Sequence, residues 1–273
     1  MLNGSETPPE PARRGLVVAI ANQKGGVGKT TTAINLGASL ALEGHSVLLV
    51  DLDPQGNAST GLGARTSDGG RSVYSVLIGH SALDEVVVPT SVDNLALAPA
   101  SIDLAGAELE MVSMLSREQR LAAAIAPVAG EYDTILVDCA PSLGLLTINA
   151  LAAAHELLIP VQCEFYALEG LGQLMDSIDL VRDSLNTDLY IGNVLLTMFD
   201  ARTKLSTDVA AQIRDYFGER VFRTVIPRSI RLSEAPSYGE PIELYDRMSP
   251  GAVAYRYVAM EFLQRHRQQE QAR

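Results

Sequence analysis

Residues 22–31 of the chain read NQKGGVGKTT. An apolar run containing β-branched residues precedes this stretch at 16–21 and is typical of a buried strand. Residues 32–43 follow it with apolar residues at helical spacing, and Gly44 is placed to end that helix. A second apolar run lies at 47–50. Strand, glycine-rich loop, helix and strand in this order predict one unit of a parallel sheet.

The rest of the chain continues the same alternation. Further strands are expected at 95–98, 134–137, 157–161, 190–196 and 221–226. Helices are expected at 105–126, 143–153, 168–185, 207–217 and 252–267, and residues 65–94 form an irregular region with one or two short helices. The sequence therefore predicts an α/β fold with a single doubly wound, mostly parallel sheet flanked by helices. This domain spans 16–267, between a disordered N-terminal tail at 1–15 and a polar C-terminal tail at 268–273.

Composition excludes several classes of protein. The formal net charge of −12 argues against a simple polycation that coats nucleic acid. Cys139 and Cys163 provide neither a disulfide framework nor a paired metal motif, which suits a reducing cytosol. Residues 1–14 lack the apolar segment of a signal peptide, and no stretch approaches 18 consecutive apolar residues. We therefore expect a cytoplasmic protein without a transmembrane helix.

The glycine-rich loop holds two of the three lysines in a chain that otherwise uses arginine for positive charge, namely Lys24 and Lys29. Glycines between a strand and a helix let backbone N–H groups converge on phosphate oxygens at the helix N-terminus. Lys29 is placed to reach the β- and γ-phosphates of a nucleotide, and Thr30 to offer a hydroxyl to Mg²⁺. Gln23 stands where the strict phosphate-loop pattern has its first glycine. The alternative, a turn that binds nothing, is disfavoured by the strand before it and the helix after it.

Three carboxylates are expected at the ends of predicted strands. Asp51 and Asp53 follow the second strand, and Asp138 ends the run at 134–137. Open parallel sheets bind ligands at the carboxyl ends of their strands. Each aspartate alone would suit a helix cap, but three of them together with the glycine-rich loop indicate a Mg²⁺–nucleotide site, with Asp138 holding the metal.

At this point the chain resembles the ParA/Soj family of chromosome- and plasmid-partition ATPases, which are relatives of the division-site ATPase MinD. The resemblance is carried by KGGVGKTT at 24–31, DLDPQGN at 51–57, DCAP at 138–141, QCEFYALEG at 162–170, DART at 200–203 and IPRSIRLSEAP at 226–236. It covers about 16–263 and implies a phosphate-loop ATPase that uses ATP and Mg²⁺. Ser229 departs from the pattern, since many relatives have Asn at this position.

The resemblance assigns roles to individual residues. It implies that two protomers join face to face on ATP, that Lys24 reaches the partner's phosphates, and that Asp53 orients the attacking water. Thr30, Asp51 and Asp138 are implied to hold the Mg²⁺, and residues 227–231 are implied to close over the adenine. The residues expected to contact the nucleotide are Lys24, Gly25, Gly26, Val27, Gly28, Lys29, Thr30, Thr31, Pro227 and Arg228. Lys24, Lys29 and Asp53 are those expected to act in catalysis.

The resemblance also bears on partners. Residues 200–231 contain seven basic and four acidic residues, which on charge alone suits a solvated surface. Arg202 and Arg231 match positions implied to bind double-stranded DNA without sequence preference in the ATP-bound homodimer, where phosphate contacts need no base readout. A ParB-type protein that stimulates hydrolysis is the implied partner, and its short basic segment is expected to dock near the helix at 105–126. The implied location is the nucleoid, and the implied function is chromosome or plasmid partition.

Three alternatives stay open at this stage. A MinD-like membrane ATPase needs an amphipathic basic C-terminal helix, whereas residues 264–271 are polar all round. An electron-transfer protein of the nitrogenase iron-protein kind needs two cysteines facing the dimer axis, and Cys139 and Cys163 suit buried positions better. A ParA-like positioner of another cargo is not separated from a partition ATPase by the sequence.

Overall fold

The computed structural model describes residues 15–64, 70–164 and 169–271. Within these ranges the centre of the molecule is a seven-stranded sheet with the order β3-β4-β2-β5-β1-β6-β7. All its strand pairs are parallel except β3 with β4. The strands are β1 (Leu16–Ile20), β2 (Val47–Leu52), β3 (Val88–Pro89), β4 (Leu95–Ala98), β5 (Thr134–Cys139), β6 (Glu156–Gln162) and β7 (Tyr190–Thr197). The predicted doubly wound, mostly parallel sheet is confirmed.

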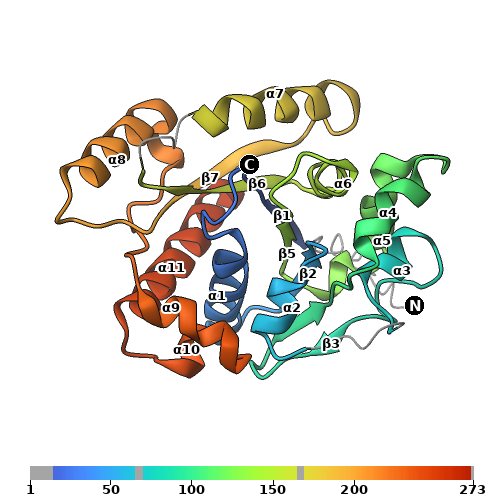
Figure 1. The fold of residues 1–273 in the computed structure, drawn as a ribbon, viewed down its shortest axis with the longest axis horizontal. Coiled ribbons are helices and arrows are strands. Elements are labelled where there is room, and N and C mark those ends of the chain that lie inside the picture. Colours follow the sequence, from blue (N-terminus) through green and yellow to red (C-terminus); the bar gives the residue numbers. More distant parts are fainter. Residues whose placement is uncertain (1–14, 65–69, 165–168, 272–273) are drawn as a thin grey trace, which may run out of the picture.

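Helices cover both faces of this sheet (Figure 1). One face carries α1 (Lys29–Leu42), α2 (Asn57–Gly61), α9 (Ile230–Glu234), α10 (Ile242–Tyr245) and α11 (Pro250–Gln271). The other carries α3 (Val73–Leu77), α4 (Leu104–Met111), α5 (Arg120–Ile125), α6 (Leu145–Ala153), α7 (Glu169–Ser184) and α8 (Lys204–Phe217). Short 3₁₀ turns lie at η1 (Arg117–Gln119), η2 (Ala129–Glu131), η3 (Gly218–Arg220) and η4 (Ala235–Tyr238).

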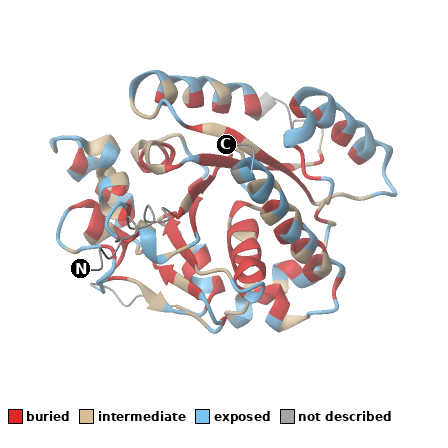
Figure 2. Ribbon diagram, turned by 180° about the vertical axis from the view of Figure 1, so that it is seen from behind, coloured by how far each residue is buried: buried red, intermediate tan, exposed pale blue. Residues whose placement is uncertain are grey.

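Two apolar clusters, one on each face, form the core (Figure 2). Every residue of β2 and β5 is buried, because helices cover both sides of these central strands. Helix α1 approaches the sheet closely at Gly37, where a Cβ would already lie 3.4 Å from the side chains of Leu136 and Leu95. This packing fixes the first helix, and hence the loop before it, relative to the strand ends.

The predicted strand at 221–226 is wrong. Phe222 N–H and Ile226 N–H donate to β7, to Val194 O (2.9 Å) and Leu196 O (2.8 Å). Between them, Arg223 N–H and Thr224 N–H donate to the Glu261 carboxylate of α11 instead. The segment therefore makes one isolated bridge to β7, between Val221 and Val194, rather than a continuous ladder.

The predicted helix at 105–126 is also divided. It ends as α4 at Met111, and Ser116 then adopts a left-handed conformation with φ of 50°, which an α-helix cannot accommodate. Other predicted helices differ at their ends: α1 begins three residues earlier, at Lys29, and α11 runs on to Gln271. Of the predicted helix at 168–185, residue 168 lies outside the described residues, as do residues 1–14 of the predicted tail.

Candidate functional site

The glycine-rich loop connects β1 to α1 at the carboxyl end of the sheet, and β1 lies between two other strands. β1 pairs with β5 on one side and β6 on the other. Gly26 and Gly28 have φ of 72° and 90°, the left-handed region that favours glycine. Asn22 Nδ2 donates to Pro160 O (2.8 Å) of β6, and Thr197 Oγ1 of β7 donates to Val27 O (2.8 Å). The loop is thus held from two strands, and the N–H groups at the start of α1 are of the kind that bind anions.

Lys29 lies in that first turn and is buried, with 6% of its surface exposed. Its Nζ donates to Lys24 O at 3.2 Å, a contact within the loop itself. Burial lowers the pKa of Lys29, and the nearby charges of Asp138, Cys139 and Asp53 oppose that shift. A buried ammonium whose contact is a neutral carbonyl is placed to receive an anion.

Asp51 and Asp138 lie side by side, because β2 and β5 are neighbours and their register pairs these two residues. Asp51 is fully buried and accepts from Ser59 N–H (2.8 Å), Ser59 Oγ (2.6 Å) and Asp53 N–H (3.2 Å). Burial raises the pKa of Asp51 to about 6, although the hydrogen bonds from Ser59 oppose it. Asp53 itself accepts from Gln55 N–H (2.9 Å). Asp51 therefore anchors α2 through its two hydrogen bonds with Ser59. The sequence did not indicate this contact.

Asp138 is different, because neither of its carboxylate oxygens has a hydrogen-bond partner among the described residues although both are buried. Burial, and then the charge of Asp51, raise its pKa well above the usual range, while the Thr30 hydroxyl and the Lys29 ammonium oppose the rise. An orphaned carboxylate beside a hydroxyl and an ammonium fits a Mg²⁺ ion that also binds phosphate. No group of three His, Cys, Asp or Glu side chains in the described ranges could hold a metal ion unaided. Phosphate and water ligands would therefore have to complete the shell.

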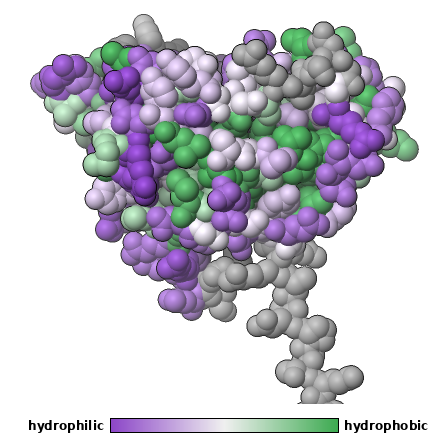
Figure 3. All heavy atoms as spheres, turned by 90° about the horizontal axis from the view of Figure 1, so that it is seen from below, coloured by the Kyte–Doolittle hydropathy of each residue, from purple (hydrophilic) through white to green (hydrophobic). Residues whose placement is uncertain are grey.

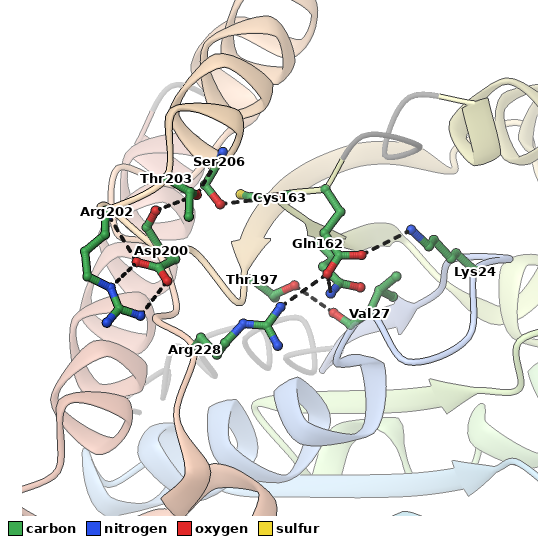
Figure 4. A network of polar contacts seen from close by, with 11 residues as sticks. Lys24, Val27, Gln162, Cys163, Thr197, Asp200, Arg202, Thr203, Ser206 and Arg228 are labelled. Carbon is green, nitrogen blue, oxygen red and sulfur yellow. Dashed lines mark hydrogen bonds and ion pairs between the residues drawn. The ribbon is translucent and has the colours of Figure 1, made fainter.

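Lys24 belongs to a second polar cluster beside the loop. Its Nζ lies 4.0 Å from Glu164 Oε2, just beyond the end of β6, and Glu164 Oε1 accepts from Arg228 Nη2 (3.2 Å) and Gln162 Nε2 (2.5 Å). Pro227 pairs with Phe199 beyond β7, which brings the 226–228 segment to this edge of the sheet. Figure 4 shows Lys24 and Arg228 reaching toward the end of β6 from opposite sides. The structure thus brings the predicted phosphate and adenine elements to one edge of the sheet.

Arg202 and Arg231 both carry local counter-charges. Arg202, with 87% of its side chain exposed, pairs with Asp200 through two contacts of 2.8 and 2.7 Å, and this pair lowers the pKa of Asp200 to about 2. Arg231 contacts Glu234 at 3.0 Å and Asp246 at 3.5 Å. The face shown in Figure 3 mixes hydrophobic and hydrophilic residues, without reference to the sign of their charge. Charge alone does not mark a nucleic-acid surface here.

The two cysteines are buried members of the core, Cys139 in β5 and Cys163 after β6. Burial raises the pKa of both thiols, that of Cys163 to about 11. Neither environment favours the thiolate that an iron–sulfur cluster requires.

Comparison with known proteins finds a matching family model and similar sequences over most of the chain. A family model described as an AAA domain matches residues 15–191. The sporulation initiation inhibitor protein Soj of Bacillus subtilis is 56% identical over 90% of this chain and 98% of Soj. The chromosome partitioning protein ParA of Myxococcus xanthus is 51% identical over 92% of this chain and 89% of ParA.

Solved structures agree with this fold. Cobyrinic acid a,c-diamide synthase from Mycobacterium smegmatis, solved with a bound ATP analog and magnesium, has a TM-score of 0.82 and 40% identity, covering 93% of this chain and 96% of that one. The septum site-determining protein MinD from Pyrococcus horikoshii, complexed with Mg-ADP, has a TM-score of 0.72 and 25% identity, covering 91% and 96%. Among the described residues, no helix is both long and apolar enough to cross a membrane.

Proposed function

The chain belongs to the ParA/Soj family of partition ATPases, and from this membership we propose that it dimerises on ATP, binds duplex DNA without sequence preference and partitions a chromosome or plasmid with a ParB-type partner. It is a P-loop ATP hydrolase that uses ATP and Mg²⁺. The observation that carries the proposal is the buried Lys29 ammonium beside the orphaned Asp138 carboxylate at the glycine-rich loop. That pairing has no evident structural purpose without a phosphate and its metal ion.

Different residues of the site bind different parts of the nucleotide and its metal ion. Backbone N–H groups of residues 25–31 donate hydrogen bonds to phosphate oxygens, and Lys29 adds its charge at the β- and γ-phosphates. Thr30 and Asp138 would hold Mg²⁺, with Asp51 next to Asp138, and the ion would supply positive charge at the phosphates. Pro227 and Arg228 lie where the adenine end of the nucleotide is expected.

Lys24 and Asp53 act in hydrolysis. Lys24 is the cation delivered to the partner protomer's phosphates, where it stabilises transition-state charge as an arginine finger does. Asp53 orients the attacking water. Its carboxylate accepts from the Gln55 N–H, which keeps it at the strand end.

DNA binding is assigned to Arg202 and Arg231. Both are exposed, so phosphate oxygens can reach them, but each must exchange its carboxylate partner for phosphate. Two protomers double the number of these contacts, which makes binding depend on the ATP-bound dimer. We further propose that the protein works on the nucleoid in the cytoplasm.

The alternatives receive less support. The buried cysteines argue against an iron–sulfur electron carrier, and the last turns of α11 carry the polar residues 264–271 rather than an apolar face for a membrane. The diamide synthase named for one solved structure is 40% identical to this chain, whereas Soj is 56% identical. A positioner of another cargo remains a second candidate, which the identity of the partner protein would decide.

Fluorescence anisotropy of labelled random-sequence duplex tests the proposal. Wild type should bind with ATP and not with ADP, and Lys24→Ala should bind in neither state because it cannot complete the dimer. Binding that is equal with ADP and ATP would exclude a nucleotide switch.

A further inference from the structure

The side chain of Asn22 lies where β1 passes into the glycine-rich loop, and both ends of its amide are bonded to the main chain. Its Nδ2 donates to Pro160 O at 2.8 Å, and its Oδ1 accepts from Lys24 N–H at 3.0 Å. The residue is buried, with 5% of its surface exposed. Because one partner is an acceptor and the other a donor, the amide can be oriented in only one way. Losing either bond would leave a buried polar group without its partner.

Sheet geometry explains why an asparagine suits this position. β1 pairs with β6 over residues 18–20, and Ala21 N–H still donates to Leu158 O at 3.2 Å. The next carbonyl of β6 on the same side is Pro160 O, two residues further on. It accepts from the Asn22 side chain, which takes the place that an N–H of a longer β1 would occupy. The side chain thus continues the hydrogen bonding to β6 while the main chain turns into the loop.

The other end of the amide fixes the main chain of Lys24. An asparagine oxygen that accepts from the N–H two residues further along closes a tight turn. The carbonyl of Lys24 is held as well, because Lys29 Nζ donates to it at 3.2 Å. Both main-chain groups of Lys24 therefore have defined partners, and Asn22 connects them to β6. The Lys24 side chain itself is partly exposed, so its ammonium can be offered to another molecule.

We propose that Asn22 is a positioning residue for ATP hydrolysis, which sets the point from which Lys24 reaches the phosphates of a second protomer. The inference rests on the proposed role of Lys24 in the ATP dimer. Asn22 acts through its two hydrogen bonds to main-chain groups, and the charge that acts on the phosphates is that of Lys24. The amide thus transfers the rigidity of the central sheet to the start of the loop.

Loss of the Asn22 amide should impair hydrolysis more than ATP binding, because other contacts hold the rest of the loop. Lys29 belongs to the first turn of α1, and Thr197 Oγ1 donates to Val27 O at 2.8 Å. A cation that stabilises transition-state charge must be placed accurately, and a small displacement lowers the rate strongly. We expect the hydrolysis rate to decrease by at least about 10-fold, and ATP affinity to change by less than about 3-fold.

Substitutions of Asn22 separate this role from a general loss of packing. Asn22→Ala removes both hydrogen bonds, and Asn22→Leu, which fills a similar space without donor or acceptor, replaces it if the alanine variant does not fold. Asn22→Ser keeps a hydroxyl that can accept from the N–H two residues on, and should restore the rate to within about 3-fold of wild type. Asn186→Ala is the matched control, since Asn186 Nδ2 donates to Ala154 O (2.7 Å) before the amino end of β6, away from the loop.

The first test needs no nucleotide. Amide hydrogen exchange of Lys24, followed by NMR on isotope-labelled protein, reports how firmly its N–H is held. Exchange should be at least about 5-fold faster in Asn22→Ala than in wild type, slower again in Asn22→Ser, and unchanged in Asn186→Ala. Equal exchange rates in Asn22→Ala and wild type would overturn the positioning role, whatever the function of the protein.

The second test measures hydrolysis at saturating ATP, ATP affinity by calorimetry and dimerisation by light scattering, on variants that urea unfolding shows to be folded. The expected result is a lower rate with retained affinity in Asn22→Ala and recovery in Asn22→Ser. Rate and affinity that fall together, or a serine variant as slow as the alanine variant, would overturn the inference. If wild type neither dimerises nor hydrolyses ATP, the proposed function fails, whereas the exchange result still decides whether Asn22 holds Lys24.

Discussion

At the scale of single residues, the free energy of the site is dominated by charges that burial leaves incompletely paired. In the described part of the chain, the Lys29 ammonium donates a hydrogen bond to a neutral carbonyl, and the buried Asp138 carboxylate has the Thr30 hydroxyl nearby but no hydrogen bond of good geometry. Keeping such groups out of water costs stability, and the cost is recovered when a ligand supplies the missing charges. Binding of Mg²⁺ and nucleotide should therefore also stabilise the fold.

Lys29→Ala should reduce ATP affinity by at least about 100-fold, since the charge-assisted contacts of a buried ammonium contribute on the order of 3 kcal/mol. Titration calorimetry with ATP and Mg²⁺ measures the loss. Lys204→Ala removes an exposed lysine at the start of α8 and serves as the matched control, with affinity like that of wild type. Retention of wild-type affinity by Lys29→Ala would refute the assignment of the phosphate loop.

Asp51 makes the stability of the nucleotide-free protein depend on pH. Its folded-state pKa of about 6 lies above the usual value of 3.8, so between these values the folded state holds a proton that the unfolded state has lost. Its contribution to the free energy of unfolding is therefore present below about pH 4 and decreases as pH rises through about 6, by up to about 3 kcal/mol. Urea unfolding from pH 4 to 7 should show Asp51→Asn gaining stability relative to wild type as pH rises. Parallel pH profiles for the two proteins would contradict this account.

At the scale of elements, the site is positioned by strands that do not belong to the strand–loop–helix unit itself. Thr197, at the end of β7, holds the loop through Val27 O, and Cys163 O accepts from Ser206 Oγ of α8 at 3.2 Å. The neighbouring strand ends therefore determine where the loop lies. A defect at the end of β7 should therefore reduce nucleotide affinity as well as the stability of the fold.

Thr197→Val keeps the shape of the side chain but leaves the Val27 carbonyl without this donor. We expect ATP affinity to decrease about 3- to 10-fold, and the free energy of unfolding to decrease by about 1 kcal/mol. Thr197→Ser retains the hydroxyl and should keep most of the affinity. Calorimetry and urea unfolding separate the two effects, and equal affinities for the Val and Ser variants would count against a role for this bond.

Local sequence patterns predicted the strands and helices that are continuous and strongly apolar, such as β2 and β5. They failed at 221–226, where the side chain of Glu261 from α11 takes two backbone N–H groups away from β7. They also failed at Ser116, whose left-handed backbone no local pattern indicated. In the site, strand ends predicted Asp51 and Asp138, but the Ser59 and Thr197 contacts depend on tertiary packing. Glu164 lay within a recognised motif without an assigned role.

At the scale of the whole molecule, charge must be considered locally and not as a total. The chain carries −12, yet Arg202 and Arg231 are held at the surface by the carboxylates Asp200, Glu234 and Asp246. The proposed DNA binding would then exchange carboxylate for phosphate and be opposed by the overall charge. Such binding should be weak for a monomer and sensitive to salt.

Arg202→Ala and Arg231→Ala should each weaken DNA binding by the ATP-bound protein while leaving ATP affinity unchanged. Each substitution removes two phosphate contacts per dimer, so the slope of log affinity against log salt concentration should shrink by about 2. Anisotropy over a salt series measures the slope, with Arg223→Ala as an exposed arginine control. Slopes equal to that of wild type would place the DNA surface elsewhere.

The two outer edges of the sheet affect how the protein behaves at high local concentration. Residues 221–228 occupy hydrogen-bonding groups along the exposed side of β7, and the opposite edge is the two-residue strand β3, which ends at Pro89. Neither edge offers a long row of unpaired N–H and C=O groups to a neighbouring molecule. Copies of the chain brought to high local concentration are thereby protected from pairing edge to edge into fibrils.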